Sequence, residues 1–87
     1  MAQYFLHLRD HVDEVLDPDG LDFEDMDALR SAVVACARDV ICGDLRNGLI
    51  DLRYRIDAEN AQGQIVYSLP FSAAFSIIPE HPPANDL

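Results

Sequence analysis

A stripe of apolar residues at helical spacing constrains this chain more than any other feature of its sequence. The stripe recurs every three or four positions, as one face of an α-helix does, and consists of Met26, Leu29, Val33, Cys36, Ala37 and Val40. Asp25 is a candidate N-cap, Asp27 lies in the first turn, and Gly43 is a candidate C-terminal stop. Residues 44–48 either add one more helical turn or form a loop. Because a helix with one apolar face must bury that face, the predicted helix over residues 25–43 needs a second layer to pack on.

Alternating segments on both sides of the helix predict that second layer. Residues 3–9, 52–59 and 65–71 alternate apolar and polar side chains with the period of two that is typical of β-strands. Residues 60–63 supply a turn between the last two segments, and residues 14–17 are a shorter candidate strand. The chain therefore predicts an α+β fold in the order β(β)αββ, with an antiparallel sheet of three to four strands and one helix packed on one face.

The predicted hairpin also assigns its side chains to two faces. The apolar face is expected to hold Leu52, Tyr54, Ile56, Ala58, Ile65, Tyr67, Leu69 and Phe71. The other face carries Arg53, Arg55, Asp57 and Glu59, whose mixed signs predict a solvated surface with cross-strand ion pairs.

The length of 87 residues suits one domain, which we expect over residues 1–78, followed by a flexible proline-containing tail at 79–87. No apolar run approaches the ~20 residues of a membrane-spanning helix, and the first residues do not resemble a signal peptide. Cys36 and Cys42 would lie about 9 Å apart along one helix, too far for a disulfide, so reduced thiols are expected. These features predict a cytoplasmic protein with no membrane partner.

The net charge of −10 is concentrated in one stretch, residues 10–27, which we call the acidic segment. It holds nine acids and no base: Asp10, Asp13, Glu14, Asp17, Asp19, Asp22, Glu24, Asp25 and Asp27. Such a field repels phosphate backbones, which argues against direct nucleic-acid binding and against anionic membranes. The chain has no lysine, so a Schiff-base lysine and a P-loop lysine are both excluded.

The sequence from Tyr4 to Asp10, Tyr-Phe-Leu-His-Leu-Arg-Asp, carries a resemblance. Together with Asp19-Gly20, Asp25-x-x-Ala28, an alanine-rich helix and a final hairpin, it resembles a family of small bacterial proteins of unknown function that open with a Tyr-Phe-Phe-His-Leu-Arg-Asp-Gly-like motif. The similarity covers about residues 3–78; Leu6 stands where a second Phe is common and His11 where Gly is common. The resemblance implies no activity. A looser similarity in element order to HicB-type antitoxin domains would imply partner binding.

The motifs that suggest a metal each fail at a defined position. Asp17-x-Asp19-Gly20 is similar to a calcium loop, but that alignment puts Val15 and Met26 where the first and last carboxylate or amide ligands should be. His7 and His11 have the spacing of a zinc pair only on a helix, whereas this stretch is predicted as a strand and a turn. We therefore predict no metal site.

Catalytic chemistry has no candidate in the sequence either. No serine lies in a nucleophile-elbow motif, and no single carboxylate pair stands out from the acidic segment as an acid–base dyad. The glycines are isolated and form no phosphate-binding loop. We predict a protein that is not an enzyme and needs no cofactor.

These observations lead to two hypotheses for function. The first is a non-enzymatic cytosolic protein-interaction or accessory domain, which binds a basic protein partner through its acidic surface and which can also form a homodimer. The expected binding residues are Asp13, Asp17, Asp19 and Asp22, with Phe5 and His7 on a first strand that we expect at an edge of the sheet. The alternative is an acidic nucleic-acid mimic that inhibits a basic nucleic-acid-binding protein of a host or phage.

Overall fold

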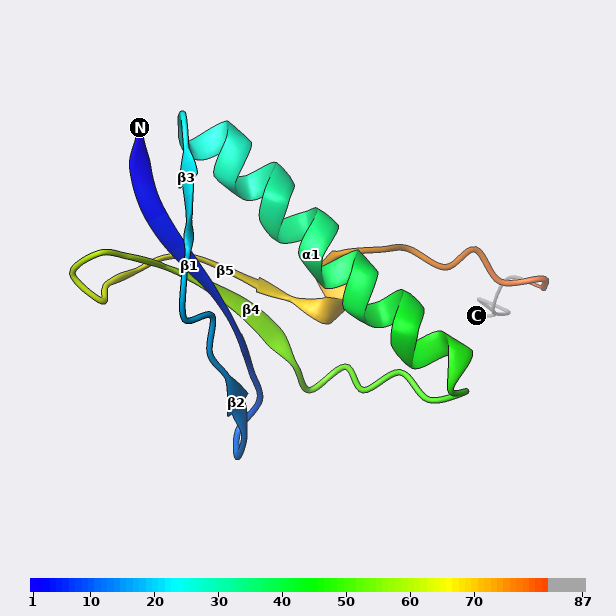
Figure 1. The fold of residues 1–87 in the computed structure, drawn as a ribbon. Helices are drawn as coiled ribbons and strands as arrows, with labels where there is room; N and C mark the ends of the chain where they lie inside the picture. Colours follow the sequence, from blue (N-terminus) through cyan, green and yellow to red (C-terminus); the bar gives the residue numbers. More distant parts are fainter. Residues whose placement is uncertain (82–87) are drawn as a thin grey trace, which may run out of the picture.

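The computed structural model describes residues 1–81 and shows an antiparallel sheet with one long helix on it (Figure 1). The elements are, in order, β1 (Ala2–Arg9), β2 (Glu14–Val15), β3 (Leu21–Phe23), α1 (Met26–Arg46), β4 (Arg55–Asn60), β5 (Ile65–Pro70) and a 3-10 turn, η1 (Phe71–Ala73). The predicted α+β class, the antiparallel sheet and the single helix on one face are confirmed. The sheet has five strands, one more than the predicted upper limit.

The first strand is central in the sheet, so the expectation that it forms an edge is wrong. On one side β1 pairs along its length with β4, from Tyr4 opposite Asn60 to Arg9 opposite Arg55. On its other side, β3 pairs with the start of β1 and β2 with its end. The sheet order is β2-β1-β4-β5, with β3 beside β1, so β5 forms the opposite edge. β3 is not among the predicted strands, because three residues are too few to show a period of two.

The helix begins where the sequence predicts, and of the two alternatives for residues 44–48 the structure shows the additional turn. Asp25 is extended, with φ −155° and ψ 179°, and its side chain accepts a hydrogen bond from the Ala28 N–H at 2.8 Å. Gly43 does not end the helix, which continues to Arg46; a glycine inside a helix is unfavourable by only ~1 kcal/mol. The end falls at Asn47, followed by Gly48 with φ +82°. Gly48 therefore supplies the left-handed residue that the prediction assigned to Gly43.

The core lies between α1 and the sheet. The helix contributes Leu29, Val33, Ala37 and Ile41, and the facing residues are Ile56, Ala58, Leu69, Phe71 and Ala74. Met26, Cys36 and Val40 of the predicted stripe lie at the margin of this core, partly buried. Ile41, which is not part of the predicted stripe, takes the buried position near the C-terminal end of the helix.

A β-bulge changes the predicted faces of the hairpin. The register between β4 and β5 shifts between Ala58 and Glu59, so that Ile65 lies opposite Glu59. Ile65 therefore shares the face that points away from the helix and is 54% exposed, contrary to its predicted place on the apolar face.

The structure tests the predictions about a membrane-spanning helix and about the C-terminal tail only over residues 1–81. Among residues 1–81, no helix is both long and apolar enough to cross a membrane. Residues 75–81 are irregular after η1, and residues 82–87 of the predicted tail lie outside the described part of the chain. The predicted domain boundary at residue 78 stays a prediction.

Candidate functional site

The acidic segment forms β2, β3 and their connections along one edge of the sheet (Figure 1). Five of its nine carboxylates are held by bonds within the protein: Asp10, Glu14, Asp17, Asp25 and Asp27. The other four, Asp13, Asp19, Asp22 and Glu24, are exposed, and their carboxylates make no hydrogen bond or ion pair to residues 1–81. Less than half of the segment's carboxylates are thus free to face a partner.

Asp17 is a structural residue of this edge. Its Oδ2 accepts the Leu6 N–H of β1 at 3.2 Å, and its Oδ1 accepts the N–H groups of Asp19 and Gly20, each at 3.2 Å. Leu6 lies between the part of β1 that pairs with β2 and the part that pairs with β3, so the carboxylate replaces a missing strand partner. Burial raises the pKa of Asp17, but these three N–H donors outweigh it and hold the pKa below its ordinary value.

Gly20 fixes how closely this loop approaches β1. It has φ +68°, a conformation that side chains rarely adopt, and a Cβ there would lie 2.9 Å from the Phe5 ring and from the Tyr4 carbonyl. Phe5 is therefore half-covered by the acidic segment and is not a free aromatic side chain.

His7 is buried behind this loop, with 8% of its surface exposed. Its Nδ1 accepts the Asp17 N–H at 3.0 Å, so the proton of the neutral ring is on Nε2, which lies 3.5 Å from Glu59 Oε1. The Phe5 ring stacks beside it at 6.3 Å between centroids and 11° between planes. Both ring nitrogens thus face protein groups, and the structure presents neither to a partner.

The sheet face away from the helix carries a connected polar network around Asp57, which is 1% exposed. Its carboxylate accepts the Ser68 hydroxyl at 2.7 Å, Arg9 Nη1 at 3.1 Å and Arg55 Nε at 3.2 Å. The same Arg9 nitrogen lies 2.6 Å from Glu59 Oε2, and Arg9 Nε lies 2.9 Å from Glu14. The predicted cross-strand ion pairs exist, but their centre is buried and not solvated.

The carboxylates and arginines of this network stabilise one another's ionised forms. Burial raises the pKa of Asp57, but the hydrogen bonds from Ser68, Arg9 and Arg55 together lower it below its ordinary value. Glu59, Glu14 and Asp57 raise the pKa of Arg9. A carboxylate of low pKa is a weak base for the Ser68 hydroxyl, so the network joins β1, β4 and β5 and does not resemble an activated nucleophile. Among residues 1–81, no three His, Cys, Asp or Glu side chains are placed to hold a metal ion.

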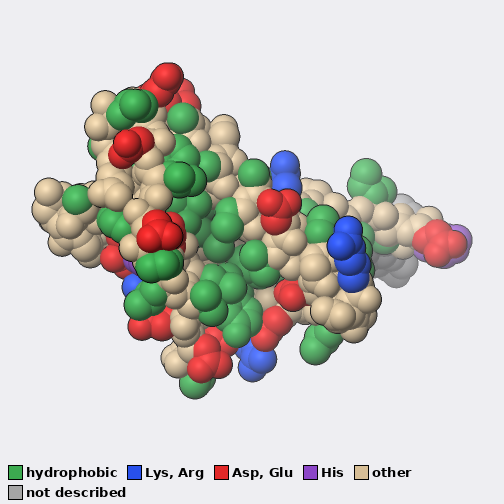
Figure 2. Space-filling model, viewed as in Figure 1, with side chains coloured by type: hydrophobic (Ala, Val, Ile, Leu, Met, Phe, Trp, Pro, Cys, Tyr) green, Lys and Arg blue, Asp and Glu red, His purple; other side chains and the backbone are tan. Residues whose placement is uncertain are grey.

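On the helix side of the sheet, an apolar groove runs between α1 and β3, which we call the α1–β3 groove. Figure 2 shows hydrophobic side chains gathered in a band over this part of the molecule. The groove has a volume of about 520 Å³ and is lined by Leu6, Asp17, Leu21, Phe23, Ala32, Ala35, Cys36, Asp39 and Val40. Leu21 is 66% exposed although its neighbours are apolar. Burial and the charges of Asp39 and Asp17 raise the pKa of the Cys36 thiol.

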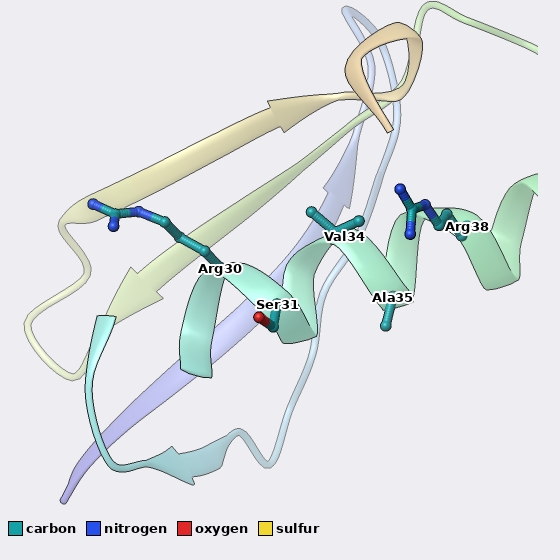
Figure 3. Close-up of a pocket in the computed structure, with 5 residues that line it drawn as sticks. All are labelled: Arg30, Ser31, Val34, Ala35 and Arg38. Atoms are coloured by element: carbon teal, nitrogen blue, oxygen red, sulfur yellow. The ribbon is translucent and has the colours of Figure 1, made fainter. Parts of the chain in front are cut away.

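The other flank of α1 is basic. Figure 3 shows Arg30 and Arg38 on one side of the helix with Val34 between them. Together with Ser31 and Ala35, these residues line a hollow of about 330 Å³. Both arginines are used within the fold: Arg38 Nε donates to the Ala74 carbonyl at 2.7 Å, and the Arg30 guanidinium lies 5.9 Å from the centre of the Tyr67 ring. These contacts leave the α1–β3 groove as the better candidate for a binding surface.

The groove is not among the predicted sites, although the sequence contains two signals for it. The small residues Ala32 and Ala35 lie beside the apolar stripe and leave room next to the sheet. Leu21 is an apolar residue in an otherwise acidic loop. Neither signal was sufficient without β3, which places Leu21 and Phe23 opposite α1.

The fold and its groove define a small single-helix sheet domain with polar and apolar faces on opposite sides. The chain matches DUF6894, a domain of unknown function, over residues 3–72, and it belongs to this family. The match agrees with the resemblance to a family of unknown function. No curated protein and no solved structure matches the chain.

Proposed function

We propose that this protein is a non-enzymatic interaction domain that binds a basic amphipathic segment of a partner protein in the α1–β3 groove. The observation that carries the proposal is an apolar groove next to the acidic segment, with carboxylates in its lining. An apolar floor with a charged rim fits a segment that is apolar on one side and basic on the other.

The floor of the groove supplies the affinity. Leu21, Phe23 and Val40 are exposed or only partly buried, so a partner side chain can remove apolar surface from water by packing on them. Each buried side chain of this size contributes about 1.5–3 kcal/mol before the unfavourable terms of association.

The rim supplies the selection for positive charge. Asp39 is exposed and makes no hydrogen bond or ion pair within residues 1–81, and Asp17 is ionised by its backbone contacts. The free acids of the acidic segment add a long-range field that speeds the approach of a basic partner.

A synthetic helical peptide with leucines on one face and lysines on the other tests the proposal. It should shift the amide resonances of Leu21, Ala35 and Val40, and a peptide with glutamates in place of the lysines should not bind. Leu21→Ala should weaken binding about tenfold. Leu49→Ala is the matched control, because Leu49 is 76% exposed and lies outside the groove lining, so its removal should not change binding.

The thiol of Cys36 gives an independent measurement. In a Cys42→Ser background, the bound peptide should slow the reaction of Cys36 with a maleimide, because Cys36 lines the groove. Equal labelling rates with and without saturating peptide would contradict binding in this groove, as would equal losses from Leu21→Ala and Leu49→Ala.

The nucleic-acid mimic is the less favoured function. A mimic needs carboxylates along a continuous exposed face, whereas five of the nine in the acidic segment are held by intramolecular bonds. The two functions predict different results in a competition experiment. Added DNA or RNA should displace the partner of a mimic, whereas it should leave a segment bound in the groove in place. We place the protein in the cytoplasm, and its surface charge argues against direct contact with nucleic acids or membranes.

A further inference from the structure

We propose that this chain forms a symmetric homodimer in which β5 pairs antiparallel with β5 of a second copy. The strand order leaves β5 at an edge, where it pairs with β4 alone within the described residues. An edge strand presents unpaired N–H and C=O groups, which another strand can complete. This inference uses a different surface from the proposed groove and does not depend on it.

The β5 edge lacks the charges that usually keep edge strands apart. From residue 60 to residue 79 the chain has no charged side chain, although a quarter of the chain, 25%, is charged. Apolar side chains in this stretch are exposed: Ile65 is 54% exposed, Val66 37%, Ile77 75% and Ile78 93%. Natural proteins protect such edges with charges, prolines or β-bulges. β5 has no charged side chain, and its proline, Pro70, and its bulge with β4 lie on either side of residues 67–69, so the pairing we propose is centred on this short stretch.

The ladder between β4 and β5 shows which main-chain groups face outward. The Phe71 N–H donates to the Tyr54 carbonyl on the neighbouring segment at 3.1 Å. In an antiparallel ladder the direction alternates, so Leu69 turns its N–H the same way and Ser68 turns its N–H and C=O toward the free edge. Two copies related by a two-fold axis near Ser68 can exchange these two groups.

The distribution of charge selects a second copy as the partner of this edge. A chain with net charge −10 repels itself at most contacts, but the acidic segment lies at the other edge of the sheet. Three strand spacings separate the two edges, which is about 14 Å and exceeds the ~8 Å screening length at physiological salt. Pairing through β5 therefore joins two uncharged edges and leaves the acidic segments at the far ends of one continuous sheet.

Two substitutions at Ser68 test the pairing. Ser68→Pro removes the outward N–H, and Ser68→Ala is the matched control, because both variants lose the hydroxyl bond to Asp57. In sedimentation equilibrium, the wild type and Ser68→Ala should associate to the mass of two chains, and Ser68→Pro should weaken association by more than about tenfold. A wild type that stays monomeric at millimolar concentration, or equal association of the two variants, would overturn the proposal.

Hydrogen exchange in the wild type tests the same contact without a substitution, so the proposal stays testable if Ser68→Pro does not fold. The Ser68 amide should exchange at least about tenfold more slowly in the concentrated than in the dilute protein. The amide of Asp13, at the acidic edge, should exchange at the same rate in both. An associated protein whose Ser68 amide shows no added protection would also overturn β5 pairing.

Discussion

The two edges of the sheet differ in charge, in strand length and in how their main chain is satisfied. At the acidic edge, two short strands cover the ends of β1, and the Asp17 carboxylate accepts the Leu6 N–H between them. At the other edge, β5 is a single uncharged strand of six residues. Short strands and charges are means by which proteins block the addition of further strands. The comparison shows one edge covered by short acidic strands and the other without charge, with only Pro70 and a bulge to oppose a further strand.

The core beneath both edges sets the largest expected effect. Val33→Asp places a charge at a position that is 0% exposed, between α1 and the sheet. We expect a loss of several kcal/mol, enough to unfold a domain of this size in thermal melts. Ala35→Asp on the exposed side of the same helix is the control and should stay folded. A cooperatively melting Val33→Asp variant would show that the two edges do not depend on a shared core.

The close approach of the acidic edge to β1 predicts the next largest effect. Gly20→Ala combines the strain of φ +68° with contacts of 2.9 Å to the Phe5 ring and the Tyr4 carbonyl. We expect a destabilisation of about 2–3 kcal/mol by urea unfolding. Gly63→Ala has a similar φ, +79°, with nothing within 4 Å of its Cβ, so it should lose only about 1 kcal/mol. Equal losses would mean that the loop does not press on Phe5.

The carboxylate of Asp17 predicts a smaller effect that depends on pH. Asp17→Asn should destabilise the fold by about 1–2 kcal/mol at pH 7, because three backbone N–H groups lose their charged acceptor. Asp19→Asn, at an exposed neighbour, should stay within about 0.5 kcal/mol of the wild type.

The pH dependence follows from the sign of the shift. The folded protein lowers the pKa of Asp17, so the ionised carboxylate stabilises the fold above its unfolded pKa of about 3.9 and loses this effect as the pH falls through the lower folded value. Chemical unfolding at pH 7, 4 and 3 should therefore show the wild type and Asp17→Asn converging at the lowest pH. If the difference in unfolding free energy between the wild type and Asp17→Asn stayed constant with pH, the destabilisation would come from the shape of the side chain and not from its charge.

The free acids predict the smallest effect on stability and a clear effect on binding. The triple variant Asp13→Asn, Asp19→Asn, Asp22→Asn should melt within about 0.5 kcal/mol of the wild type, because these side chains make no intramolecular bond to residues 1–81. It should associate more slowly with the lysine peptide and show a flatter dependence on salt. Near 1 M salt, where the screening length is about 3 Å, the two proteins should bind alike. A triple variant with unchanged salt dependence would show that the acidic edge does not attract the partner.

The helix and its face could be predicted from the sequence because the information is local. The recurring apolar stripe and Asp25 both act within a few residues, and the structure confirms the buried Val33 and the N-cap. The end of the helix stayed open between Gly43 and Gly48 because both glycines carry the same local signal, and the structure places it at Asn47.

The edges and the site could not be predicted because their determinants are distant in the sequence. β3 exists through its pairing with β1, and the central place of β1 follows from both sets of partners. Ile65 changes face through a bulge that leaves no mark in its own alternation. Asp17 has the sequence context of a surface acid, yet its role depends on Leu6 and His7, which precede it by about ten residues. The α1–β3 groove could not be predicted because β3, which supplies part of its lining, was not predicted.

The central position of β1 has a consequence for how the chain folds during synthesis. Among the described strands, β1 leaves the ribosome first and needs β4 as its neighbour, with Tyr4 opposite Asn60, so residues 4–60 must emerge before the two can pair. Contacts between such distant residues slow folding, since closing the long loop precedes the gain from pairing. In the interval, β2 and β3 are the described strands that can pair with β1, and the charges of the acidic segment disfavour pairing with other strands. Arrested nascent chains of increasing length, probed by limited proteolysis, should acquire protection only after residue 60 has left the exit tunnel.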